Sequence, residues 1–367
     1  MSRELSLEVN KLCNFSCSFC YTEKYKEDLP PIEQVLALID EGISIGVRSI
    51  SMTGGEPLLQ WERVAAIATH AKRHSLRTRL NTNGYFLVPS TKTTELSDLI
   101  DEFQVSFNAI GDEQYAGYAG LKATHRPYSR VLSNVTHLLE QSRSVTIRFT
   151  LDHDTAPYLA SVFQLFCLGD SRIRGMRVGK FKVRVAVPAA DRFRGDSTAT
   201  VEIKAAASEF FSLAEKNTDV AIQFKDGSGL IRIPERLPHL SAPACICGAG
   251  SIHVSADLRR VTPCVFVRER IENSLGELRS GAQQLRDIWA QPAAIGFLGN
   301  DSEGASCASH SIWQSQSSCS SPTSEIAWPN VVKVSLPRSH SKTRTLAGQG
   351  VDREISATCL DNTVTDK

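Results

Sequence analysis

The first half of the chain carries short alternating apolar runs, separated by longer segments in which apolar residues recur every three or four positions. Alternation predicts strands, and the wider spacing predicts helices. The predicted strands cover residues 5–9, 47–52, 78–80, 103–108, 145–151 and 181–187. The clearest predicted helices cover residues 32–45 and 131–140. Strands that alternate with helices indicate parallel βαβ units, so we expect an α/β fold.

Three cysteines follow the first predicted strand with the spacing C-x3-C-x2-C: Cys13, Cys17 and Cys20. Three thiolates from one loop are one ligand short of the four that hold an ordinary [4Fe–4S] cluster, so one iron would stay open to a non-protein ligand. A structural zinc loop or chance clustering is the alternative. Zinc loops usually add a second cysteine pair or histidines, whereas the first histidine of this chain is His70.

A Gly-Gly-Glu-Pro turn, residues 54–57, follows the second predicted strand directly. In α/β barrels and open sheets, ligands bind at the carboxyl ends of the strands. Glycines permit close backbone approach to a ligand, and proline stiffens the exit from the turn. By itself the tetrapeptide is more typical of an ordinary βα turn.

Together, the cysteine loop, with Phe19 before its last cysteine, and the turn resemble the radical S-adenosylmethionine (SAM) enzymes. The resemblance implies a [4Fe–4S] cluster on the three cysteines, whose open iron binds the amino and carboxylate groups of SAM. Reduction of that cluster would cleave SAM to a 5′-deoxyadenosyl radical. It also implies a partial (β/α)6 TIM-like barrel over residues 1–190. The SAM-contacting residues that it implies are Phe19, Gly54, Gly55, Glu56, Pro57, Thr82, Asn83, Ser106 and Asn108.

Two positions depart from the family pattern. Tyr118 stands where peptide-modifying members often carry an arginine, so we expect Arg148 to contact the SAM carboxylate, with Arg126 or Arg130 as alternatives. Asn108 replaces the usual aspartate, which keeps a hydrogen-bonding group and removes the charge.

A second cysteine group contains Cys245, Cys247 and Cys264. Residues 252–256 and 261–264 predict a β-hairpin that would bring Cys247 and Cys264 together at its open end. This resembles the auxiliary-cluster hairpin of the SPASM and twitch extensions, with Cys245 as a tentative further ligand. Arg259 stands where those hairpins usually have glycine. Buried free cysteines are the alternative.

We expect four regions: the barrel over residues 1–190, a bridging region over 191–240, the auxiliary-cluster region over 241–300, and a tail over 301–367. The tail is rich in Ser and Thr and lacks apolar periodicity, which predicts disorder. It holds Cys307 and Cys319, where a full SPASM domain would have a dense run of cysteines. Either the extension is twitch-like, or a SPASM domain is truncated or scrambled near residue 300. Cys167 is expected to pack in the core, and Cys359 is not expected to be a ligand.

Charge and composition disfavour two classes of binding partner, nucleic acids and membranes. The chain has 41 Lys and Arg against 40 Asp and Glu, and without a basic block it lacks the footprint of a nucleic-acid-binding protein. No apolar run is long enough to span a membrane. The ten cysteines and the absence of a secretory signal favour metal ligation in a reducing cytoplasm.

The resemblance implies an oxidoreductase that is reduced by a flavodoxin- or ferredoxin-type protein. Most enzymes of the SPASM and twitch branch modify ribosomally made peptides, by crosslinking, thioether formation or epimerisation, which makes a peptide the leading substrate class. No leader-peptide-binding domain precedes the first predicted strand, which keeps a small molecule, such as an aminocyclitol or sugar, as the alternative. A non-catalytic iron–sulfur electron carrier would need neither the turn nor the barrel.

Overall fold

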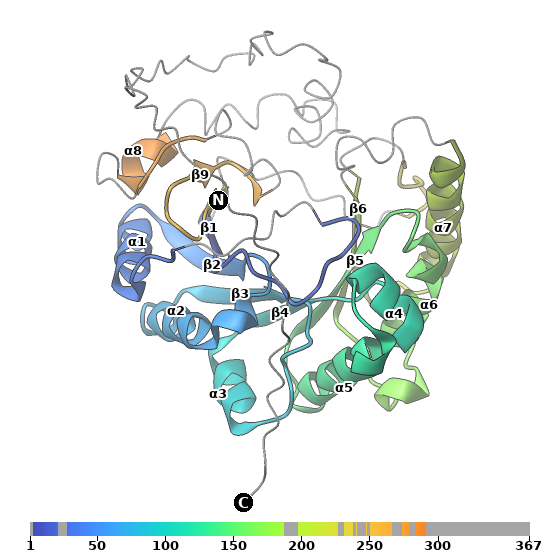
Figure 1. The fold of residues 1–367 in the computed structure, drawn as a ribbon. Helices are drawn as coiled ribbons and strands as arrows, with labels where there is room; N and C mark the ends of the chain where they lie inside the picture. The colour runs from blue at the N-terminus through green and yellow to red at the C-terminus, as the bar shows by residue number, and fades with distance from the viewer. Residues whose placement is uncertain are drawn as a thin grey trace, which may run out of the picture. The chain divides into compact units, whose positions relative to one another are not determined.

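A single curved sheet organises the part of the chain that the computed structural model describes (Figure 1). The described residues are 3–20, 28–186, 197–226, 231–237, 240, 247, 250–265, 274–278 and 284–290. The nine strands are β1 (Arg3–Glu8), β2 (Val47–Thr53), β3 (Arg77–Thr82), β4 (Glu102–Ser106), β5 (Val145–Leu151), β6 (Lys180–Val185), β7 (Ala221–Lys225), β8 (Ser251–Val254) and β9 (Val261–Thr262).

The helices lie mainly between consecutive strands and pack outside the sheet (Figure 1). They are α1 (Ile32–Ser44), α2 (Trp61–Arg73), α3 (Thr91–Leu99), α4 (Asp112–Ala119), α5 (Pro127–Glu140), α6 (Leu159–Cys167), α7 (Ser197–Glu215) and α8 (Leu285–Ala290). Four short 3-10 turns complete the described elements: η1 (Pro57–Gln60), η2 (Ala123–His125), η3 (Ala156–Tyr158) and η4 (Ser171–Ile173). Among the described helices, none is long and apolar enough to cross a membrane.

The strand order is β7-β6-β5-β4-β3-β2-β1-β8-β9, and all neighbours are parallel except β8 and β9. Neighbours in sequence are neighbours in the sheet from β1 to β7, as repeated βαβ units require. The described end strands β7 and β9 do not pair with each other, so the sheet stays open. These features confirm an α/β fold of the partial-barrel kind.

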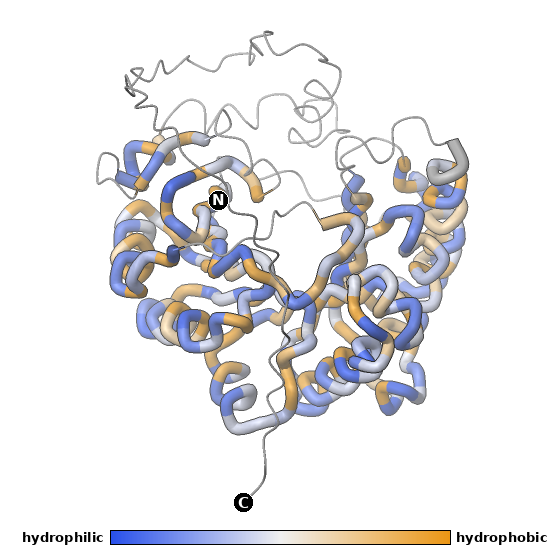
Figure 2. The backbone as a smooth tube through the Cα atoms, in the orientation of Figure 1, coloured by the Kyte–Doolittle hydropathy of each residue, from blue (hydrophilic) through white to orange (hydrophobic). Residues whose placement is uncertain are grey.

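The two faces of the sheet differ in polarity, as strand alternation requires. In β6, Phe181 and Val183 are buried, whereas Lys182 is only half-buried on the opposite face. Phe181 meets Phe163 of α6 edge to face, with ring centroids 5.3 Å apart. The apolar face therefore packs on the helices, and the concave face is polar. Figure 2 shows hydrophilic and hydrophobic positions interleaved along these elements.

All six strands predicted from alternation are present, with boundaries that differ by a few residues. Both predicted helices are present as α1 and α5. The predicted hairpin is confirmed as the antiparallel pair β8–β9. The sequence did not predict β7, which lies in the supposed bridging region, or the parallel pairing of β8 with β1.

The hairpin turn forms without glycine at position 259. Leu258 takes a positive φ of 58°, and the Asp257 carboxylate accepts a hydrogen bond from the Arg259 backbone N–H over 3.0 Å. Several predictions lie outside the described residues: those for Cys245, the 301–367 tail, Cys307, Cys319 and Cys359. The four-region division stays a prediction.

Candidate functional site

The cysteine loop is anchored by one buried aromatic residue. Phe15 is fully buried and meets Tyr85 and Tyr115 edge to face, with centroid distances of 5.8 and 6.2 Å. The Ser16 N–H donates to the carbonyl of Ala119, at the end of α4, over 2.6 Å. Aromatic burial and this backbone bond fix a segment that has no regular secondary structure.

All three cysteines of the loop, Cys13, Cys17 and Cys20, are half-buried. The backbone N–H of Phe15 lies 3.4 Å from the Cys13 sulfur, and the Asn83 side-chain amide lies 3.9 Å from it. Both contacts place N–H groups beside a sulfur that would be a thiolate when bound to metal. N–H groups directed at the sulfurs are a common means of tuning iron–sulfur clusters.

The Gly-Gly-Glu-Pro turn packs directly against the chain that leads into the cysteine loop. A Cβ on Gly54 would lie 2.2 Å from the carbonyl oxygen of Asn10, and a Cβ on Gly55 would lie 2.0 Å from that of Leu12. The Gly55 N–H donates to Asn10 over 2.8 Å, and the Glu56 N–H donates to Leu12 over 2.7 Å. In the structure, the two glycines permit close approach of this protein backbone. Their predicted contact with SAM stays a prediction.

Glu56 is buried completely and its carboxylate is directed into the protein. One oxygen accepts hydrogen bonds from the Thr82 hydroxyl at 2.7 Å and the Leu58 N–H at 3.1 Å. The other accepts from the Asn83 N–H at 2.8 Å. Burial raises the pKa of Glu56 to about 7, although the three donors favour its charged form. Glu56 thus ties the end of β2 to the end of β3.

Asn83 connects this network to the cysteine loop. Its side-chain amide donates to Asn14 over 2.8 Å and lies beside Cys13, while its side-chain oxygen accepts from the Tyr85 N–H over 3.0 Å. The predicted site residues of the loop and the next two strand ends therefore form one connected unit.

The predicted ribose-contacting residues lie at the end of β4, and their groups are partly engaged within the protein. The backbone carbonyl of Ser106 accepts from the Tyr115 hydroxyl over 3.1 Å. Asn108 is buried, and its side-chain oxygen accepts from the Thr150 N–H over 2.7 Å. Tyr118, at the position of the missing arginine, hydrogen-bonds Asn108 and stacks on Phe19 at 5.9 Å. Burial raises the pKa of Tyr118 well above its usual value, so its hydroxyl stays neutral.

Of the three arginines considered for the SAM carboxylate, Arg148 has the most suitable place. It pairs with Ser106 across β4 and β5, and its guanidinium lies 3.4 Å from the Asn81 side-chain oxygen. Arg126 is exposed and lies 3.9 Å from Asp112. Arg130 covers the Tyr85 ring and donates to the carbonyl of Tyr85 over 3.0 Å.

A charged layer on the concave face was not predicted. Arg79 bridges Glu4 and Glu102 at 2.7 and 3.1 Å, and Lys182 lies 3.8 Å from Glu102. Burial opposes ionisation of Glu102, but the charges of Arg79 and Lys182 outweigh it and hold its pKa at about 2. Burial lowers the pKa of Lys182 to about 7. Charged residues at alternate strand positions were the sequence signal for this layer.

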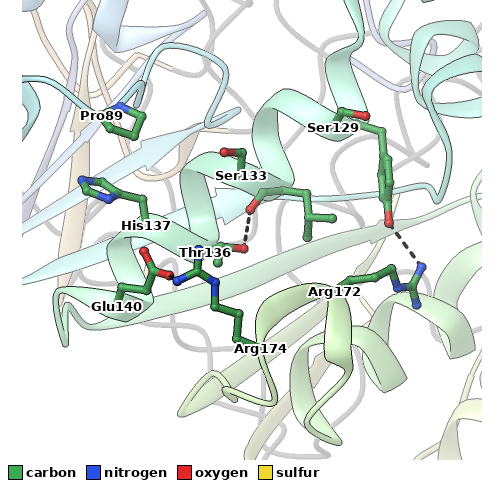
Figure 3. A pocket seen from close by; sticks show the side chains of 10 residues that line it. Pro89, Ser129, Ser133, Thr136, His137, Glu140, Arg172 and Arg174 are labelled. Carbon is green, nitrogen blue, oxygen red and sulfur yellow. Dashed lines mark hydrogen bonds and ion pairs between the residues drawn. The ribbon is translucent and has the colours of Figure 1, made fainter.

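The described surface also has a hollow of about 400 Å³ along α5 (Figure 3). Arg174 and Glu140 form an ion pair on its wall, and Arg172 donates to the Tyr128 hydroxyl over 3.2 Å. No cysteine of the loop and no residue of the Gly-Gly-Glu-Pro turn lines it. The hollow therefore does not belong to the candidate site.

The two described members of the second cysteine group, Cys247 and Cys264, flank the hairpin strands β8 and β9, and β8 pairs with β1. Cys247 forms an isolated bridge with Ser251 at the start of β8, and buried Cys264 lies two residues after β9. In an antiparallel hairpin these positions are at the same end. The joint ligation of Cys247 and Cys264 stays a prediction.

Comparison with known proteins adds a family match over part of the chain. Residues 7–163 match the model of the Radical SAM superfamily. A GTP 3',8-cyclase from Helicobacter pylori is 29% identical over 154 residues, which are 40% of this chain and 45% of that protein. A probable GTP 3',8-cyclase from Saccharolobus islandicus is 27% identical over 134 residues, 36% of this chain and 43% of that protein. The matches thus span less than half of these relatives.

Two solved structures share the fold. Streptococcus suis SuiB bound to precursor peptide SuiA gives a TM-score of 0.58 at 13% identity, covering 81% of this chain and 66% of that chain. Native anSMEcpe with bound AdoMet and Kp18Cys peptide gives a TM-score of 0.61 at 15% identity, covering 82% and 83%. At such identities the likeness concerns the fold alone.

Proposed function

We propose that the protein is a radical SAM enzyme that generates a 5′-deoxyadenosyl radical from SAM to oxidise a substrate, which the match of residues 7–163 to the Radical SAM superfamily model supports. The single observation that carries the proposal is the connection of the cysteine loop, Glu56 and Asn83 in one hydrogen-bonded unit at the strand ends. Ligands bind at this end of parallel strands.

The residues present fit a [4Fe–4S] cluster. Cys13, Cys17 and Cys20 would hold three irons, with N–H groups of Phe15 and Asn83 beside the Cys13 sulfur. When bound, the cluster and SAM supply one-electron reductive cleavage of SAM and hydrogen abstraction from a substrate carbon.

The protein's own residues hold and shape this centre. Phe15 and the Asn10–Leu12 backbone fix the loop, and Glu56 fixes the two strand ends that face it. Arg148 is proposed to bind the SAM carboxylate from β5, next to Ser106. Neutral Tyr118, stacked on Phe19, supplies an apolar wall that limits water near the loop.

A ribosomal peptide is the proposed substrate class, oxidised by crosslinking, thioether formation or epimerisation. Two proteins of similar fold, SuiB and anSMEcpe, are described with a bound precursor peptide and a bound peptide. An extended peptide can enter the open side of a partial barrel and form backbone hydrogen bonds at an edge strand. A flavodoxin- or ferredoxin-type protein is the proposed reductant.

A small-molecule substrate is the second candidate, in the class of a sugar or aminocyclitol dehydrogenation. Two sequence relatives are named as GTP 3',8-cyclases. Because GTP is a small molecule, these names favour a small-molecule substrate. The charged layer of the concave face, with Arg79 and Lys182, also suits a compact polar substrate.

The core reaction is tested by anaerobic cluster reconstitution followed by SAM and dithionite. Methionine and 5′-deoxyadenosine should form together. S-adenosylhomocysteine with a methylated product would instead indicate methyl transfer and refute the proposal. For the substrate, a mass change in a co-encoded peptide supports the first candidate, whereas consumption of a cyclitol with all such peptides unchanged supports the second.

We also propose an auxiliary [4Fe–4S] cluster on Cys247 and Cys264, with Cys245 as a further ligand. It would accept the electron from the substrate radical and make the net reaction an oxidation. Reconstituted protein should contain about eight irons per chain with this cluster and about four without it. A value near four would refute the auxiliary cluster and leave the barrel site untouched.

A further inference from the structure

Two helices on the outer layer bring together a set of three metal-binding side chains. His70 lies in the last turn of α2, and His74 caps the C-terminal end of the same helix one turn later. Asp40 lies on the neighbouring helix α1. The Asp40 carboxylate oxygen is 2.7 Å from Nε2 of His70 and 3.7 Å from Nε2 of His74. The two imidazole rings have centroids 4.7 Å apart.

The spacing suits a single ion. Residues four apart on a helix face the same side, so both imidazoles are presented toward α1. All three ligand atoms lie within 4.8 Å of one another. In a tetrahedral zinc site with bonds of about 2.0–2.1 Å, ligand atoms lie about 3.3 Å apart. The observed distances from the Asp40 oxygen, 2.7 Å to His70 and 3.7 Å to His74, lie on either side of that value.

The donor chemistry selects the class of ion. Two neutral imidazoles and one carboxylate suit zinc and other divalent transition metals, whereas calcium and magnesium prefer oxygen ligands. The side chains of His70, Asp40 and His74 are 16%, 53% and 44% exposed. A fourth position would therefore open to solvent and take water.

We propose that Asp40, His70 and His74 form a zinc-binding site that clips α2 to α1. The site is independent of the cysteine loop and of the radical chemistry. Without metal, Asp40 and His70 form a hydrogen bond at the end of α2, and bound zinc would replace the proton that they share. Bound metal would also resist separation of the two helices, since a ligand that binds the folded state alone stabilises it.

The test uses reconstituted enzyme with its cluster cysteines filled by iron and with loosely bound metal removed by EDTA. Zinc chloride is titrated by calorimetry, and the melting temperature is measured with and without zinc. We expect one additional zinc per chain and a rise in the melting temperature, with unchanged iron content. The His70→Gln, His74→Gln double variant should bind zinc at least about tenfold more weakly and lose the rise.

Asp40→Asn provides a milder second variant, since its side chain is exposed and its amide cannot supply the charged ligand. His137→Gln on α5 is the matched control, because His137 is a helical histidine outside the group. The zinc affinity of His137→Gln, and the increase in its melting temperature on addition of zinc, should equal those of wild type. Equal zinc affinity in wild type and in the double variant would overturn the proposal, as would absence of a zinc-dependent rise in wild type. Formation of 5′-deoxyadenosine by the double variant would show that it is folded.

Discussion

The Thr82 hydroxyl donates to the Glu56 carboxylate over 2.7 Å, inside a network that excludes solvent from Glu56 completely. The same carboxylate accepts from the Asn83 N–H, and the Thr82 hydroxyl accepts from the Gly84 N–H over 3.0 Å. With the Leu58 N–H, three groups from two strand ends donate hydrogen bonds to the one carboxylate. Glu56 is thus a positioning residue that sets the distance between two strand ends, one of which contacts the cysteine loop.

Replacement of Glu56 by glutamine should weaken SAM binding and leave the iron content unchanged. At pH 8, where Glu56 is mostly ionised, glutamine has one acceptor oxygen fewer than the carboxylate. One of the N–H or O–H donors would then face another donor at a cost of about 1–3 kcal/mol. The end of β3 would then shift, but no cysteine would be lost. SAM affinity is measured by calorimetry on reconstituted protein, and iron by chelation. The exposed Glu62 provides the control Glu62→Gln, which should match wild type; lower iron in Glu56→Gln would contradict the prediction.

The buried Glu56 carboxyl should also make stability depend on pH in one direction. Burial raises its pKa from 4.5 to about 7, so between these values the folded protein holds a proton that the unfolded chain has released. Stability should therefore fall as pH rises from about 4.5 to about 7, by roughly 3 kcal/mol in all, and level off above. Urea unfolding at pH 5.5–8 checks this. The difference between wild type and Glu56→Gln should decrease over that range; a constant difference would contradict it.

The periodicity of the sequence predicted the barrel strands well, because alternation in β5 and helical spacing in α1 are local properties. Two features depend on contacts between distant residues. Strand β8 pairs with β1, for example Leu5 with Ile252, and no local pattern records that pairing. The parallel pairing of β7 with β6, for example Ile222 with Phe181, likewise joins residues far apart in the sequence.

The residue types of the candidate site were also evident from sequence, but their contacts were not. The sequence assigned Gly55 and Glu56 to a ligand-facing turn. The structure shows Gly55 against the Leu12 carbonyl and Glu56 directed toward Thr82. Their contact with SAM stays a prediction, since motif spacing predicted the turn and only the folded structure shows which protein atoms the turn packs against.

Alanine at Gly55 should prevent normal cluster assembly. Its Cβ would lie 2.0 Å from the backbone oxygen of Leu12, which cannot move without displacing the cysteine loop. We expect lower iron incorporation and a loss of about 1–3 kcal/mol in stability. Gly117→Ala in α4 is the control, because its Cβ would meet no atom within 4 Å and alanine favours helix. Normal iron content in Gly55→Ala would show that the loop is less constrained than its contacts indicate.

Alanine at Cys13, Cys17 and Cys20 together should abolish the barrel cluster and the formation of 5′-deoxyadenosine. Cys167→Ala is the matched control, since this thiol is fully buried on α6 and its raised pKa keeps it neutral. The control should lose some stability but retain the cluster. Iron content, visible absorption and 5′-deoxyadenosine are measured after anaerobic reconstitution. A triple variant that still cleaved SAM would refute the assignment of these cysteines.

Aspartate at Asn83 should make the barrel cluster harder to reduce. The Asn83 amide lies 3.9 Å from the Cys13 sulfur, and its N–H would stabilise the extra negative charge of a reduced cluster held there. Aspartate has nearly the same shape and keeps an oxygen for the Tyr85 N–H, but it replaces the N–H with negative charge. The potential should shift to more negative values in an EPR-monitored titration with unchanged iron content. Asn134, whose amide donates to the Gly84 carbonyl at 2.8 Å, gives the control Asn134→Asp. Asn134→Asp also adds a negative charge near the loop, but its side chain contacts no cysteine. An equal shift in the reduction potential of this control would show that added charge or distortion, and not the contact with Cys13, causes the effect.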